Sequence, residues 1–150
     1  MRKRSTYRPR PVLLDALAHV KSGMKPLTQV AGEYIKLKII NADALLALTQ
    51  GKATWQSMNK LIAAGNMAEA FAHQGIGVEW NAEIRAGEDA ILAVARRDKW
   101  VCKAGELNAI RELMDVHDAQ LEVVTVSQVE KAMDHIKEVK RNKRARRIEA

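Results

Sequence analysis

The C-terminal third of the chain has the clearest hydrophobic pattern. Residues of one seam recur at alternating steps of three and four: Leu107, Ile110, Met114, His117 and Leu121, then Val126, Val129, Met133 and Ile136. This spacing puts each set on one face of a helix. Thr125 or Ser127 can cap the second helix, and Ser127 has Glu130 three residues later, as in a capping box. The pattern predicts two amphipathic helices that form an antiparallel hairpin.

Two more helices are predicted in the middle of the chain. Thr54 can cap a helix to about Gln74, which Gly75 would end. Its predicted inward residues are Trp55, Met58, Leu61, Ile62 and Phe71. The next helix, near residues 78–97, places Ile84, Gly87, Ile91 and Val94 on one face. Gly65 and Gly87 are unfavourable inside helices, so we expect close helix contacts there.

The first 50 residues are less regular. Residues 12–22 predict a short helix, followed by Gly23, with Leu13, Leu14, Leu17 and Val20 on one face. Residues 34–40 alternate apolar residues with lysines, which suggests a strand, and residues 44–48 suggest a helix capped by Asn41 or Asp43. A strand over 34–40 would need a partner, and residues 100–102 are the best candidate. The alternative to this two-stranded ribbon is one continuous helix.

Composition favours helices over sheets. All 3 prolines lie in the first 26 of the 150 residues, and Asn-Gly and Asp-Gly turn dipeptides are absent. We therefore predict an all-α domain, a compact bundle of about five helices over residues 11–139 that ends in the hairpin. Residues 1–10 would be a basic N-terminal arm and residues 140–150 a basic C-terminal tail.

The net charge of +7 is concentrated at the two ends. Residues 1–10 hold five basic residues and no acid, and residues 131–150 hold eight basic residues against three acids, so the body between them is mildly acidic. Basic blocks of this kind favour contacts with phosphates, which release condensed counterions. The predicted nucleic-acid-binding residues are Arg2, Lys3, Arg4, Arg8, Arg10, Lys140, Arg141, Lys143, Arg144, Arg146 and Arg147. The alternative is a tail that only keeps the protein in solution.

The remaining polar residues do not form a recognisable catalytic pattern. His73, His117 and His135 lack metal-site spacing, and we interpret His117, on the apolar seam, as a core residue. Cys102 has no assignable base and is interpreted as structural. We predict no enzyme activity, no metal and no cofactor.

One group of acids keeps other hypotheses open. Asp115, Asp118 and Glu122 are interpreted as a solvated face. They could also hold the basic C-terminus in an autoinhibited state, or serve a metal-dependent nuclease, which would require a bound divalent metal.

Two sequence features bear on localisation and on membrane partners. No apolar run reaches the 18 residues that a membrane span needs, and the single cysteine suits a reducing compartment. We expect a cytoplasmic protein with no membrane partner. The sequence leaves open whether the C-terminal hairpin joins two chains into a homodimer.

The chain resembles short proteins of phages, prophages and mobile elements of proteobacteria that have no assigned function. The resemblance rests on residues 8–12 (RPRPV), 48–54 (LTQGKAT), 66–70 (NMAEA) and 117–121 (HDAQL) with Thr125. It implies no catalytic residues and favours a phage accessory role in a bacterial host. Our favoured hypothesis is a non-enzymatic nucleic-acid-binding accessory protein. The alternative is an inhibitor or adaptor that acts on a host enzyme or defence complex through the helical body.

Overall fold

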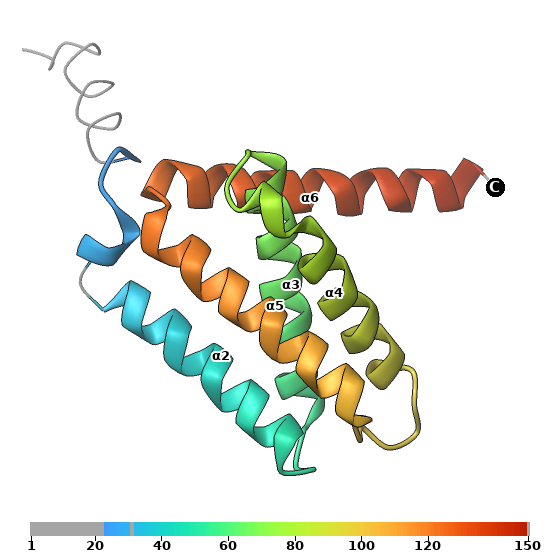
Figure 1. Cartoon of the computed structure of the whole chain (residues 1–150). Helices are drawn as coiled ribbons and strands as arrows, with labels where there is room; N and C mark the ends of the chain where they lie inside the picture. Colours follow the sequence, from blue (N-terminus) through green and yellow to red (C-terminus); the bar gives the residue numbers. More distant parts are fainter. Residues whose placement is uncertain (1–22, 31, 150) are drawn as a thin grey trace, which may run out of the picture.

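The computed structural model describes residues 23–30 and 32–149, and of residues 144–149 the helical backbone alone. This part contains five α-helices, two short 3-10 turns and no strand. The elements are η1 (Leu27–Gln29), α2 (Glu33–Thr49), α3 (Trp55–His73), η2 (Val78–Trp80), α4 (Asn81–Ala95), α5 (Ala104–Val123) and α6 (Val126–Glu149). Helices α2–α5 form a bundle, and α6 lies across one end of it (Figure 1). The all-α prediction is confirmed, and the helix predicted over residues 12–22 lies outside the described residues.

Helix α2 replaces the predicted strand. Residues 33–49 form one continuous helix, and no two-stranded ribbon is present in residues 23–30 and 32–149. The misleading alternation arises because α2 is apolar on two sides. Ala44 and Leu48 are buried, whereas Ile35, Ile39 and Leu46 are exposed. The helix ends at Thr49, and Gly51 follows with a φ of +69°, which suits glycine.

Helix α3 begins and ends where the sequence predicts. Thr54 and Ser57 form a reciprocal capping box: the Ser57 N–H donates to Thr54 Oγ1 at 3.3 Å, and the Thr54 N–H donates to Ser57 Oγ at 3.2 Å. Gly75, with φ +86°, follows the last turn. The prediction that Trp55 points inward is wrong, because its side chain is exposed, whereas that of Met58 is buried.

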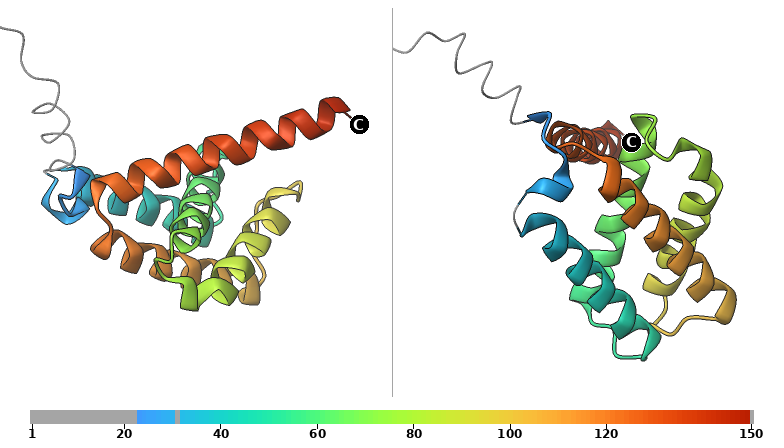
Figure 2. Two further views of the ribbon diagram at one scale, coloured as in Figure 1. Left: turned by 90° about the horizontal axis from the view of Figure 1, so that it is seen from above. Right: turned by 60° about the vertical axis from the view of Figure 1, so that its left-hand side comes forward.

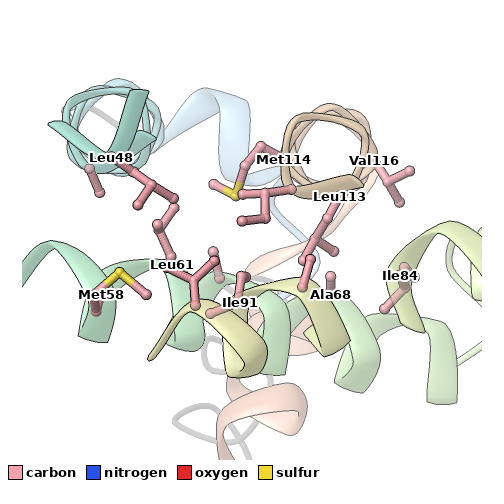
Figure 3. Packing of buried hydrophobic residues seen from close by; sticks show 14 of the residues in the cluster. Leu48, Met58, Leu61, Ala68, Ile84, Ile91, Leu113, Met114 and Val116 are labelled. Carbon is pink, nitrogen blue, oxygen red and sulfur yellow. The ribbon is translucent and has the colours of Figure 1, made fainter. Parts of the chain in front are cut away.

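The main core lies between α2, α3, α4 and α5, where side chains from all four helices point toward one another (Figure 3). Its members include Leu48, Met58, Leu61, Ile84, Ile91, Leu113 and Met114. The predicted close contacts occur at both glycines. A Cβ on Gly87 would lie 2.3 Å from Leu113 Cβ, and one on Gly65 would lie 3.3 Å from Glu88 Cγ. Helices α4 and α5 therefore approach each other over Gly87.

A second, smaller core attaches α6 to the bundle. Phe71 of α3, Leu27, Leu121 and Ala132 are buried together. In place of the predicted antiparallel hairpin, α6 turns away from α5 and crosses α3 (Figure 2). The reason is that the apolar side of α6 packs on this second core. The predicted seam residue Met133 is 48% exposed, whereas Ala132, one position earlier, is fully buried.

Backbone contacts fix the start of α6. Thr125 and Gln128, rather than Ser127 and Glu130, form the capping box, because the Gln128 N–H donates to Thr125 Oγ1 at 3.3 Å and the Thr125 N–H donates to Gln128 Oε1 at 2.9 Å. An isolated bridge between Pro26 and Thr125 ties the chain before α2 to the same junction. These contacts set the direction in which α6 leaves the bundle.

Candidate nucleic-acid interface

Helix α6 has two halves: residues 126–136, the attached half, and residues 137–149, the basic half. Val129, Ala132 and Ile136 pack against the second core. Beyond Ile136 the side chains from Lys137 to Lys143 are exposed, and the helix continues past the other helices (Figures 1 and 2). Helix α6 runs through position 140 to Glu149.

Three of the predicted nucleic-acid-binding side chains are described, and all three are exposed: Lys140, Arg141 and Lys143. Lys137, Lys140 and Arg141 stand at positions i, i+3 and i+4, so they share one face of α6. Lys143 lies toward the bundle, where it lines a hollow between α3 and α4. Lys140 lines an adjoining hollow on the same side, whereas Arg141 lines neither hollow and marks the outward face of α6.

The other predicted binding residues are only partly placed. The backbone at positions 144, 146 and 147 belongs to α6, so these positions extend the basic half by about one more turn. Arg2, Lys3, Arg4, Arg8 and Arg10 lie outside the described residues.

An acidic hollow of about 200 Å³ lies beside the basic half of α6. Glu69 of α3 and Glu88 and Asp89 of α4 line it together with Lys143. An adjoining hollow is lined by Glu69, Lys143 and Lys140. Among the described residues, one ion pair is present, between Arg97 and Glu106 at 2.6 Å. Lys143 therefore forms no ion pair with the acids of the hollow. The hollow brings opposite charges together without pairing them.

Glu88 is the most perturbed acid of this hollow. Burial, followed by the negative charge of Glu69, raises the pKa of Glu88 to about 8. Its Oε1 atom is buried without a hydrogen-bond partner. The raised pKa favours the neutral carboxyl, which lowers the negative charge that faces Lys143.

The histidines take separate positions. His73 and His135 stack, with ring centroids 4.3 Å apart and planes 15° apart. His117 is buried in the second core, stacked on Phe71 at 6.1 Å, and burial lowers its pKa to about 4. This confirms that His117 is a core residue. In residues 23–30 and 32–149, no group of three or more His, Cys, Asp or Glu side chains is arranged to hold a metal ion.

The acids interpreted as a solvated face, Asp115, Asp118 and Glu122, do not line the hollows beside the basic half of α6. Partial burial raises the pKa of Asp118, and the charge of Lys38 on α2 opposes this shift. The hydrogen bond to the Tyr34 hydroxyl raises the pKa of Lys38 most, and the charges of Asp118 and Glu122 raise it further. These acids thus face α2, and the acids next to the basic half of α6 are Glu69 and Glu88 instead. Sequence reasoning missed the Glu69–Glu88 pair because its members are 19 residues apart on two helices and share no motif.

Cys102 is half-buried against the main core, and burial together with Glu106 raises the pKa of its thiol. A raised pKa disfavours the thiolate, in agreement with a structural role.

No helix in the described part of the chain has the length and apolar character needed to cross a membrane. Comparisons with protein-family models, curated proteins and solved structures give no match for this chain.

Proposed function

We propose that this protein binds nucleic acid through the basic half of α6, mainly by contacts to phosphates and without catalysis. The observation that carries the proposal is the exposure of Lys140, Arg141 and Lys143 on a helix that extends past the bundle (Figure 1). The apolar contacts of α6 end near Ile136, so packing does not account for the residues that follow.

A helical backbone makes these charges effective ligands for a polyanion. Because α6 is already formed, binding does not have to order the backbone at Lys140 and Arg141, a cost that a disordered tail would bear. Contacts from lysine and arginine to phosphates position a nucleic acid and carry no sequence information directly. Binding of this kind is weakly selective for sequence and strongly dependent on salt.

Two sequence features support the same function. The N-terminal arm adds Arg2, Lys3, Arg4, Arg8 and Arg10, which we propose as further phosphate contacts. The resemblance to short phage and prophage proteins favours an accessory role of this type in the cytoplasm of a bacterial host.

The test is a binding titration with a charge-matched control. Fluorescence anisotropy with labelled single- and double-stranded DNA and RNA compares the wild type with Lys140→Glu/Arg141→Glu/Lys143→Glu. The control, Lys25→Glu/Lys36→Glu/Arg111→Glu, makes the same change in net charge at exposed positions outside α6. We expect the α6 variant to lose at least about tenfold in affinity and the control to lose much less.

Two outcomes would contradict the proposal. Equal losses in both variants would show that net charge alone, and not α6, determines binding. No binding by the wild type at low salt would exclude the function and direct the search to a protein partner of the helical body.

A further inference from the structure

A pair of tryptophans lies at the end of the bundle away from α6. Trp55, the first residue of α3, stacks on Trp100 from the loop between α4 and α5, with ring centroids 5.7 Å apart and planes 29° apart. In Figure 1 the loops before α3 and before α5 both lie at this end. The start of α3 and the loop between α4 and α5 are thus joined through aromatic rings.

The two rings have different surroundings. Trp100 is half-buried against the main core, and its Nε1–H donates to the Ala95 carbonyl oxygen at 3.4 Å. Trp55 is 57% exposed. Trp100 therefore supports the ring of Trp55 from one side, and much of the Trp55 ring remains in water.

Packing does not explain Trp55. The adjacent core positions of α3 are filled by Met58 and Leu61, which are fully buried. An aromatic ring held in place with a free face is typical of a binding anchor, because its orientation is fixed before the ligand arrives.

The charges around the pair indicate an anionic ligand. Lys52 lies three residues before Trp55, and Lys99 and Lys103 lie on either side of Trp100, against one exposed acid, Asp98. All three lysines are exposed. Arg97 is occupied, since it donates to both carboxylate oxygens of Glu106 at 2.6 Å and to the Val101 carbonyl at 2.9 Å. These bonds hold the loop that carries Trp100 and the lysines.

Trp80 is also exposed, but its surroundings do not suit an anionic ligand. It is 37% exposed, but its neighbours in sequence include Glu79 and Glu83 and no lysine or arginine within four residues. The chain thus has one exposed tryptophan among lysines and another among glutamates.

We propose that the free face of Trp55 stacks an unpaired base of a single-stranded nucleic acid, while Lys52, Lys99 and Lys103 contact the phosphates on either side. This inference rests on the proposed function for its ligand class and names a second, independent contact site. Bases in a duplex are stacked on each other and do not present a free face. The stacking site on Trp55, here called the platform, therefore selects single strands. Stacking on an aromatic side chain accepts any base, which suits a binder without sequence preference.

The test compares two tryptophans of the full-length protein. Affinities for a labelled oligothymidylate and for a duplex are measured for Trp55→Leu and for the matched control Trp80→Leu. We expect Trp55→Leu to weaken single-strand binding about tenfold to a hundredfold and to leave duplex binding nearly unchanged. Trp80→Leu should change neither affinity.

A spectroscopic measurement avoids dependence on the folding of one variant. In a Trp80→Phe protein the two stacked tryptophans are the emitters, and oligothymidylate should quench their fluorescence. Lys52→Glu/Lys99→Glu, which leaves both rings in place, should weaken this quenching at least about tenfold.

The outcomes separate this inference from the proposed function. If Trp55→Leu and Trp80→Leu bind the single strand equally well while the α6 charge variant does not bind it, the platform is excluded and the α6 interface stands. If quenching persists in the α6 charge variant with undiminished affinity, the platform stands and the α6 interface is excluded. Binding of an acidic peptide to Trp55 in place of the oligonucleotide would overturn the inference in favour of a protein partner.

Discussion

The bundle α2–α5 and the basic half of α6 are both helical, but for different physical reasons. In the bundle, each helix buries part of its surface, and the tightest contact places Gly87 directly against Leu113. In α6, apolar contact ends near Ile136, and the exposed residues from Lys137 to Lys143 are mostly charged. Burial holds the first region together, whereas the second depends on helix propensity and on its continuity with the attached half.

This difference indicates where each property of the molecule resides. Substitutions in the bundle should change stability, because side chains there have neighbours on all sides. Substitutions in the basic half of α6 should change binding and leave stability nearly unaltered. The following predictions test that division, from the largest expected effect to the smallest.

Gly87→Ala should have the largest effect on stability. Its Cβ would lie 2.3 Å from Leu113 Cβ and 3.0 Å from the Ala109 carbonyl oxygen, so α4 and α5 must move apart. We expect the free energy of unfolding in urea to fall by about 3 kcal/mol. Gly105→Ala is the control, since nothing lies within 4 Å of its added methyl group. Equal stability of the two variants would contradict the close α4–α5 contact.

Ile136→Ala should have an intermediate effect at the junction of the two regions. This half-buried side chain is the last that packs on the second core, so we expect a loss of about 1–2 kcal/mol. Amide hydrogen exchange should increase along α6 more than in α4. Met133→Ala, at a 48% exposed position, should change stability by less than about 0.5 kcal/mol. A larger loss from Met133→Ala would show that α6 packs through the other face.

Glu88→Gln should remove part of the dependence of stability on pH. The folded state raises the pKa of Glu88 from 4.5 to about 8, so over this range the folded chain keeps a proton that the unfolded chain releases. Stability therefore falls as the pH rises from about 4.5 to 8. The neutral amide should flatten this slope in urea unfolding series, whereas Glu130→Gln at an exposed position should not.

The groups facing Glu88 define how that result is interpreted. They are Glu69 on α3, Asp89 and Arg85 on α4, and Lys143 on α6. An unchanged slope in Glu88→Gln would mean that Glu88 ionises normally and that the hollow beside α6 carries its full negative charge.

Arg141→Ala should leave stability within about 0.5 kcal/mol of the wild type, because the side chain is exposed on the outward face of α6. Its effect should appear in binding, where loss of one phosphate contact lowers the salt slope by about 1. Arg111→Ala, also exposed, should leave the slope unchanged. A stability loss without a change in slope would assign Arg141 to the bundle.

Much of the fold follows from the sequence where one face of a helix is apolar. The period at Ile84, Gly87 and Ile91 identifies the buried side of α4, and Thr54 marks the start of α3. Hydrophobic spacing gives the wrong prediction for α2, because Ile35 and Ile39 are apolar but exposed. It also gives the wrong buried face for α6, where Ala132 is more buried than Met133. Both errors concern tertiary contacts that local spacing does not encode.

The candidate site is predictable to the same extent. The charge count locates Lys140, Arg141 and Lys143, since clustered cations appear in the sequence itself. The Glu69–Glu88 pair and the stack of Trp55 on Trp100 depend on helices and loops that meet only after folding. The sequence shows which residues carry charge, and the fold determines what faces them.

The most direct test of the central claim is the salt dependence of nucleic-acid binding, measured for the wild type and for Lys140→Glu/Arg141→Glu/Lys143→Glu. If these three residues contact phosphates, the slope of log K against log salt should become shallower by about 2–3 in the variant, at 0.7–0.9 per contact. An unchanged slope, with wild-type binding intact, would show that the basic half of α6 does not contact the nucleic acid.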